Sequence, residues 1–208
     1  MANTVKLMSF PGFMKVLKRF IDILLGSLLL VLTLPLITVI VIGIKFSSPG
    51  PIFFRQWRTG LNGKPFLIYK FRTMAVCENK FNIEQVTRDD NHITTFGAFL
   101  RRGSLDELPQ LINVLQGRMS LVGPRPHPLS MDDDFRRKVS GYVLRQKMRP
   151  GITGLAQIHG FRGEIDSLEK IKKRTDCDIE YINSWSIIGD LKIILLTPVK
   201  VFFGKNAH

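Results

Sequence analysis

Two acidic residues stand between clusters of arginine near the middle of the sequence. Asp106 and Glu107 closely follow Arg101 and Arg102 and precede Arg125. Guanidinium groups bind phosphate oxygens through paired hydrogen bonds, and a carboxylate can attack phosphorus or hold a divalent cation. Cations around two carboxylates are therefore typical of a site for a charged phosphate ester. The ordinary alternative is a helix cap, since acidic residues at helix N-termini usually serve as caps.

The residues after the acidic pair predict a short helix. An apolar stripe at helical spacing comprises Leu108, Leu111, Ile112 and Leu115. Gly117 offers a C-terminal stop. Two start signals compete, because Ser104 and Glu107 make a capping box, whereas Pro109 fits best if the helix begins nearer Asp106. Either start places both carboxylates in the first turn, where the positive end of the helix dipole keeps them ionised and attracts phosphate.

Residues 52–55 and 66–71 predict two short strands of a β-hairpin, joined through a connection that contains Asn62 and Gly63. Alternation along the second strand would bury one face and leave Lys70 and Arg72 near its end. These two side chains form either a solvated basic edge or contacts to phosphate. A short helix over residues 93–100 would deliver Arg101 to the carboxylates.

Residues 23–44 contain no charged side chain and would extend about 33 Å as a straight helix, enough to cross a hydrocarbon core of about 30 Å. Pro35 in the middle favours a kink, and lysine and arginine flank both ends, which places both in the cytoplasm. We therefore expect a re-entrant helix, with a single span as the alternative. The carbonyl that Pro35 frees would need Thr33, Thr38 or another group as a donor.

The C-terminal half predicts three further helices and a constrained turn. Asp132 and the two acidic residues after it precede a basic run within residues 131–139, which indicates dipole matching rather than a metal site. Arg149 lies in a stiff Pro-Gly segment and is available for an anion. A charged helix is expected over 165–185, with Glu169 and Lys173 paired. The mixed apolar and basic tail over 187–203 suits a helix in the membrane interface or one packed on the core. Residues 78–92 predict a surface loop.

The composition limits the class of protein. The 208 residues suit one domain and carry a net charge of +13, which points to nucleic acid, anionic lipid or nucleotide phosphates as partners. A mean hydropathy of +0.09 beside so much charge indicates segregated apolar and basic segments, as in a protein that sits on a membrane. Cys77 and Cys177 match no metal or redox spacing and are interpreted as free thiols in a reducing compartment. The four histidines are scattered, so zinc is not expected.

Several segments together resemble a known family. They are residues 104–111 (SLDELPQL), 113–115 (NVL), 119–126 (MSLVGPRP), 70–74 (KFRTM) and 149–154 (RPGITG). In these segments the sequence is similar to the bacterial sugar transferases, the monotopic polyprenyl-phosphate phosphoglycosyl transferases, and the resemblance extends from about residue 14 to the end of the chain. The end of the chain is similar to the glucose-1-phosphate members, with galactose or an N-acetylated sugar left open.

The resemblance implies an α+β fold in three parts. Residues 1–45 would form a re-entrant membrane helix broken at Pro35, where the family has Ser-Pro and this chain has Leu34-Pro35. Residues 46–186 would form a small mixed catalytic domain with a short β-hairpin and several helices, and residues 187–208 an amphipathic tail in the membrane interface. Larger members carry additional transmembrane helices before this domain, which are not expected here.

The resemblance also implies transfer of a sugar-1-phosphate from a UDP-sugar to undecaprenyl phosphate, with release of UMP. The reaction would start surface or exopolysaccharide synthesis at the cytoplasmic face of the bacterial inner membrane. Asp106 would be the nucleophile and Glu107 would hold Mg²⁺. The substrate-binding residues would be Lys70, Arg72, Arg101, Arg125 and Arg149. Membrane lipids are further partners, nucleic acid is not, and a homodimer is left open.

A rival interpretation is a non-catalytic, basic membrane-surface protein that binds nucleic acid or anionic lipid. It explains the net charge of +13 equally well. It does not explain the acidic pair, because a surface that binds phosphate gains nothing from Asp106 and Glu107.

Overall fold

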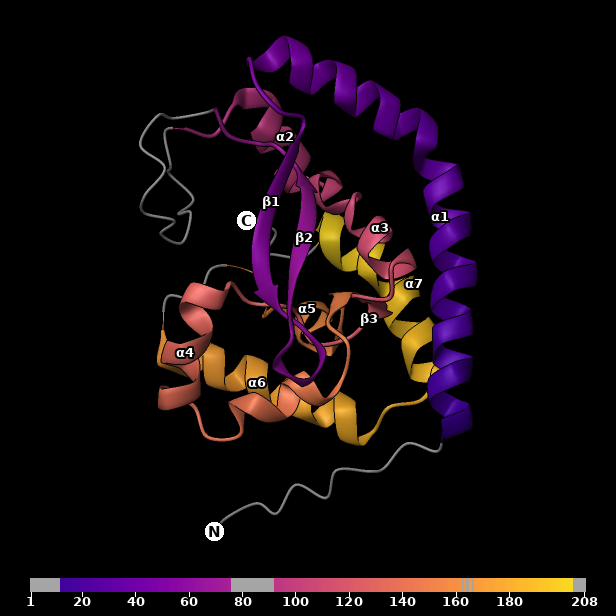
Figure 1. Ribbon diagram of the computed structural model, residues 1–208, viewed down its shortest axis with the longest axis vertical. Helices are drawn as coiled ribbons and strands as arrows, with labels where there is room; N and C mark the ends of the chain where they lie inside the picture. Colours follow the sequence, from indigo (N-terminus) through magenta and orange to yellow (C-terminus); the bar gives the residue numbers. More distant parts are fainter. Residues whose placement is uncertain (1–11, 76–91, 162, 164, 166, 204–208) are drawn as a thin grey trace.

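The computed structural model describes residues 12–75, 92–161, 163, 165 and 167–203, and these residues form a mixed α and β structure (Figure 1). The helices are α1 (Gly12–Ser47), α2 (Thr95–Arg102), α3 (Gln110–Leu115), α4 (Leu129–Lys138), α5 (Leu155–Ile158), α6 (Leu168–Asn183) and α7 (Ile187–Phe203). The strands are β1 (Phe53–Thr59), β2 (Pro65–Phe71), β3 (Ser120–Val122) and β4 (Gly151–Thr153), with 3₁₀ turns η1 (Leu61–Gly63), η2 (Leu105–Glu107) and η3 (Tyr142–Lys147). β1 pairs antiparallel with β2, and β3 pairs parallel with β4.

The apolar N-terminal segment forms one helix of 36 residues that continues through Pro35. Its axis bends, so that one arm runs along the side of the molecule and the other turns over α2 (Figure 1). By length and composition α1 could cross a membrane, and 11% of its most apolar window is buried. Thr33 and Thr38 donate to the carbonyls of residues 29, 30 and 34. Neither therefore supplies the Val31 carbonyl that Pro35 leaves without its usual donor.

The predicted hairpin is confirmed, with a first strand that extends to Thr59. Asn62 and Gly63 make its turn with φ angles of 54° and 77°, a left-handed conformation that asparagine and glycine adopt at low cost. On β2, the side chains of Phe66 and Ile68 are buried in the main core with residues of α3, β3, α6 and α7. This packing fixes β2 against the helices that follow it.

The helix after the acidic pair begins later than the sequence predicts. Asp106 and Glu107 lie in the separate turn η2, and α3 begins at Gln110. The predicted capping box is wrong, because Ser104 has a left-handed φ of 54° and its side chain makes no capping hydrogen bond. Pro109 takes the N-cap position of α3 instead. The two carboxylates are therefore held by the 3₁₀ turn and its neighbours rather than by the first turn of α3.

The other helices lie close to their predicted positions. α2, α4, α6 and α7 are all present, and Glu169 and Lys173 on α6 form the expected ion pair at 2.7 Å. The loop predicted over 78–92 lies outside the described residues except for His92. Residues near the start of α1 bind the body of the protein, since Lys18 pairs with Asp190 at 2.6 Å and Asp22 accepts from the Ser120 hydroxyl at 2.9 Å.

Candidate active site

Asp106 and Glu107 are buried beneath two cationic side chains. Lys70 Nζ lies 2.8 Å from Glu107 Oε1 and 3.5 Å from Asp106 Oδ2. Arg125 donates two hydrogen bonds to Glu107, at 2.6 Å to Oε1 and 3.2 Å to Oε2. Asp106 is 8% exposed and Glu107 is 7% exposed. A helix cap is normally solvated and bonded to its own helix, so this burial and pairing favour a functional site.

Four separate elements deliver these groups. The carboxylates come from η2, Lys70 from β2, and Arg125 from the loop after β3. Arg101, at the end of α2, donates through Nε to the Thr73 hydroxyl at 2.9 Å and lies close enough to Asp106 to favour its ionised form. The structure therefore brings three of the five predicted cationic residues to the acidic pair.

The environment of Asp106 combines low polarity with positive charge. Burial raises the pKa of Asp106, Lys70 opposes that rise, and the adjacent Glu107 charge adds to it. For Arg125, the charge of Glu107 raises the pKa, so this guanidinium stays protonated. A poorly solvated carboxylate beside fixed cations can attack phosphorus, while the cations hold the phosphate oxygens.

The loop that carries Arg125 is held by a close approach between two backbone segments. The N–H of Gly123 donates to the Thr153 carbonyl at 2.9 Å, and the N–H of Gly151 donates to the Pro124 carbonyl at 3.0 Å. A Cβ on Gly123 would meet a backbone oxygen at 2.3 Å, so only glycine fits there. The proline-flanked Arg125 is thus mounted on a rigid support beside the carboxylates.

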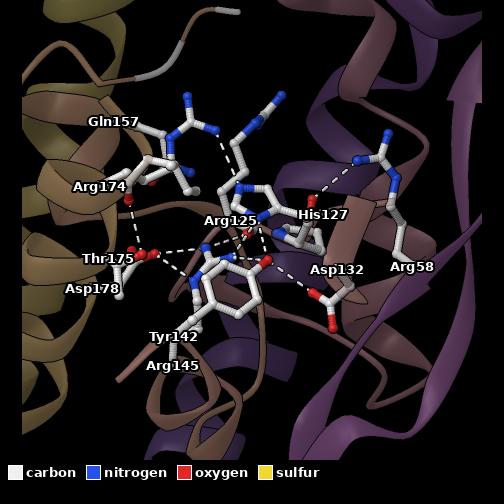
Figure 2. Close-up of polar contacts among 12 residues, drawn as sticks. Arg58, Arg125, His127, Asp132, Tyr142, Arg145, Gln157, Arg174, Thr175 and Asp178 are labelled. Carbon is white, nitrogen blue, oxygen red and sulfur yellow. Dashed lines mark hydrogen bonds and ion pairs between the residues drawn. The ribbon is translucent and has the colours of Figure 1, made fainter. Parts of the chain in front are cut away.

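A buried polar network lies behind Arg125 (Figure 2). Arg145 donates to Asp178 Oδ2 at 2.6 and 3.0 Å and to the backbone carbonyl of Arg125 at 2.6 Å. The hydroxyl of Tyr142 donates to Asp132 Oδ1 at 2.8 Å. Asp132 lies in the first turn of α4, with the basic residues in the last turn, as dipole matching predicts. It is also 4% exposed and part of this network, which the sequence did not indicate. The network ties α4, η3 and α6 to the loop that presents Arg125.

The same region holds two further cations, Arg58 and Arg174. Burial, with Arg125 nearby, lowers the pKa of Arg58 to about 10 and that of Arg174 to about 9. Within the described residues both donate to backbone carbonyls, Arg58 to Pro126 at 3.1 Å and Arg174 to Gly163 at 2.7 Å. Burial and the surrounding arginines also lower the pKa of His127 well below its usual range, so its ring is neutral. The excess positive charge around Arg125 suits a polyanionic ligand.

Two predicted site residues lie elsewhere. Arg72 donates to the carbonyls of Ser48 and Pro49 at 2.6 and 2.9 Å, at the end of α1. Arg149 donates through Nε to the Gly117 carbonyl at 3.0 Å. Both side chains brace the backbone near the site, and their contacts to phosphate stay predictions.

Sequence reasoning missed the network because its members are far apart in the chain. One signal was present, since the buried face of α6 follows helical spacing. The side chains on this face are Ile171, Arg174, Thr175, Asp178, Tyr181 and Ile182. Arg174 and Asp178 share the apolar stripe, which marks them as buried charges that need partners.

The chain matches the family model of the bacterial sugar transferases over residues 13–204. It is 51% identical to the UDP-glucose:undecaprenyl-phosphate glucose-1-phosphate transferase of Escherichia coli K12, across 95% of this chain and 42% of the relative. A protein of the same name from Caulobacter vibrioides is 46% identical, across 92% of this chain and 72% of the relative. The galactosyl transferase CpsE of Streptococcus agalactiae is 40% identical, across 91% and 43%.

The chain thus spans about two fifths of the length of the E. coli relative and nearly three quarters of the Caulobacter one. The matched region includes every residue of the acidic pair, its cations and the network behind Arg125. The match over residues 13–204 shows that the chain belongs to the bacterial sugar transferase family.

Proposed function

We propose that this chain transfers glucose-1-phosphate from UDP-glucose to undecaprenyl phosphate, releasing UMP and starting the synthesis of an exopolysaccharide. The observation that carries the proposal is the buried Asp106–Glu107 pair beneath Lys70 and Arg125, at 2.8 and 2.6 Å from Glu107. The names of the E. coli and Caulobacter relatives support the donor and the acceptor. A galactosyl transferase among the relatives keeps galactose as the second candidate sugar.

In the proposed reaction, a carboxylate oxygen of Asp106 attacks the phosphorus that carries the sugar. The bond between that phosphorus and the UMP oxygen breaks, UMP leaves, and an acyl phosphate that bears the sugar remains on Asp106. A phosphate oxygen of undecaprenyl phosphate then attacks the same phosphorus, which restores the carboxylate and forms the lipid diphosphate sugar. Lys70, Arg101 and Arg125 bind and orient the phosphate oxygens in both steps.

Mg²⁺ fits the acidic pair in a limited way. Within the described residues, no group of three or more His, Cys, Asp or Glu side chains is arranged around one point. Mg²⁺ commonly takes only one or two carboxylates and completes its shell with water and substrate phosphate, so the carboxylate of Glu107 suffices as a protein ligand. We propose Glu107 as the residue that holds Mg²⁺, which would neutralise charge on the diphosphate. Lys70 and Arg125, which now form ion pairs with Glu107, would then also bind the phosphate oxygens.

A panel of UDP-sugars tests the function. Purified protein with undecaprenyl phosphate and Mg²⁺ is expected to release UMP from UDP-glucose faster than from UDP-galactose or UDP-N-acetylated sugars. Salt-dependent binding to nucleic acid without UMP release from any donor would instead support the non-catalytic alternative. Release of UMP only from another donor would keep the reaction and replace the sugar.

We further propose that α1 is re-entrant, that α7 lies in the membrane interface, and that the site faces the cytoplasm at the inner membrane. The bend in α1 and the basic residues at both its ends support the first point. Several apolar side chains of α7 are exposed, which supports the second. They are Ile188, Leu191, Leu195, Leu196 and Val199.

Cysteine labelling tests the topology. Gly12→Cys and Ser47→Cys place single thiols at exposed ends of α1, in a background with both native cysteines replaced by serine. A Cβ at position 12 meets nothing within 4 Å, so this change is not expected to disturb the fold. In intact cells, neither thiol should react with an impermeant reagent, and both should react after lysis. Labelling of one end alone from outside would show that α1 spans the membrane.

A further inference from the structure

The free edge of β2 is closed by one side chain. β2 pairs with β1 on one edge. On the other edge, the N–H of Tyr69 donates to Asn113 Oδ1 at 3.0 Å, and Asn113 Nδ2 donates to the Leu67 carbonyl at 2.7 Å. A neighbouring strand would make the same pair of bonds, one donated and one accepted. Asn113 lies on α3 and is 0% exposed, so these bonds are shielded from water.

Asn113 connects the elements that carry opposite charges of the candidate site. Lys70, whose ammonium lies 2.8 Å from Glu107, directly follows Tyr69 on β2. The turn η2 with Asp106 and Glu107 leads directly into α3. Figure 1 shows α3 beside β2, with η2 between the ends of α2 and α3. The amide is therefore a cross-link between the backbone that holds the lysine and the backbone that holds the carboxylates.

Asparagine suits this place because its planar amide has a donor and an acceptor side by side. Leucine, of similar size, would leave the Tyr69 N–H and the Leu67 carbonyl buried without partners. Aspartate would keep the acceptor for Tyr69 but, when ionised, lack the donor for Leu67. The backbone carbonyl of Asn113 also accepts from the N–H groups of Arg118 and Met119 at 3.0 and 3.1 Å, which turns the chain toward β3.

We propose that Asn113 is a positioning residue that sets the distance from the Lys70 ammonium to the carboxylates of Asp106 and Glu107. The proposal rests on the transfer reaction proposed above. Without the cross-link, β2 can slide against α3 and Lys70 withdraws from the carboxylates. A displacement of about 1 Å in a reacting site can lower a rate about 100-fold.

The test compares Asn113→Leu and Asn113→Asp with Gln110→Leu in the wild-type and Lys70→Met backgrounds. Gln110 is a matched control, since it lies on α3, is 1% exposed and has an Nε2 without a hydrogen-bond partner within the described structure. Both Asn113 variants should lose about 100-fold in kcat with little change in KM. In the Lys70→Met background the same changes should cost almost nothing further, because Asn113 acts through Lys70. Gln110→Leu should leave kcat and KM unchanged.

A second readout needs no turnover. The substrate-free structures of both Asn113 variants should show the Lys70 ammonium farther from Glu107 Oε1 than the present 2.8 Å, whereas Gln110→Leu should keep this distance. If the wild type were inactive, the proposed function would be overturned. The second readout would still show whether Asn113 positions Lys70. Additive losses with Lys70→Met, an unchanged Lys70–Glu107 distance, or unfolding of both Asn113 variants would reduce Asn113 to a structural residue and overturn the inference.

Discussion

Asp106→Asn is expected to fold like the wild type and to lose turnover by orders of magnitude. An amide has the size of the carboxyl group but cannot attack phosphorus. The change should not destabilise the protein, because burial already disfavours the charged form of Asp106. Lys70 also keeps its shorter contact, 2.8 Å to Glu107, when the one at 3.5 Å to Asp106 is lost. UMP release and thermal unfolding, measured on the same preparation, separate catalysis from stability.

The intermediate gives the sharper form of this test. Wild-type protein with UDP-glucose and Mg²⁺ but no lipid acceptor should release UMP and gain the mass of one sugar phosphate. Trypsin would release residues 103–118 as one peptide, which contains both Asp106 and Glu107, so fragmentation of the peptide must place the added mass on Asp106. Asp134→Asn is the control, because the Asp134 side chain is 44% exposed and pairs only with Lys138 among the ion pairs of the described residues. Active enzyme that never carries the adduct would falsify the covalent mechanism and favour direct transfer between both bound substrates.

The parts of the site that follow from local sequence were predictable. The acidic pair, Lys70 on its strand and Arg125 on its proline-flanked turn all lie within short segments whose composition signals their structure. The hairpin and the main helices follow from periodicity in the same way. The start of α3 was mispredicted because Ser104 adopts a left-handed conformation that a capping motif excludes. Propensity gave no sign of this, since tertiary contacts decide it.

The contacts between distant segments were not predictable from one sequence. Asn113 bonds to β2 across more than forty positions, and Arg145 meets Asp178 across 33. Neither pair has a local pattern, because each depends on how α3 and α6 pack against the rest of the fold. The backbone contacts of Arg72 and Arg149 are a further case. Their guanidinium groups donate to the backbone carbonyls of Pro49 and Gly117, contacts that no local pattern indicated, while their predicted contacts to phosphate stay predictions.

These long-range contacts make the support of the site as important as its chemistry. Arg125 donates to the carboxylate of Glu107, and Arg145 donates to the backbone carbonyl of Arg125. Arg145 also forms an ion pair with Asp178. A carboxylate 1% exposed and a guanidinium 5% exposed in this pair have no water to replace a lost partner. Stability and activity should therefore both depend on the ion pair between Arg145 and Asp178.

Arg145→Met is expected to destabilise the protein by about 3–5 kcal/mol, because it leaves the carboxylate of Asp178 buried without its partner. It should also lower kcat, since the Arg125 carbonyl loses its donor at 2.6 Å. Urea unfolding in detergent micelles, followed by tryptophan fluorescence, measures the loss. Lys138→Met is the matched control, because its ion pair with Asp134 is 57% and 44% exposed and should contribute at most about 1 kcal/mol.

The pH dependence of this loss identifies its cause. Burial raises the pKa of Asp178, Arg145 opposes the rise, and without Arg145 only Arg174 remains to favour the charged form. Below the pKa of the unfolded chain, about 3.9, the carboxyl is protonated in both states and the variant carries no charge penalty. As the pH rises above this value the unfolded state ionises first, so the variant loses stability until the pH passes the higher folded pKa of Asp178. The difference in the free energy of unfolding between wild type and Arg145→Met should therefore widen from pH 5 to pH 8. When Asp178→Leu is added to Arg145→Met, the difference from wild type should become smaller over this pH range. A gap that stays constant with pH would assign the loss to packing around Arg145 rather than to the buried charge.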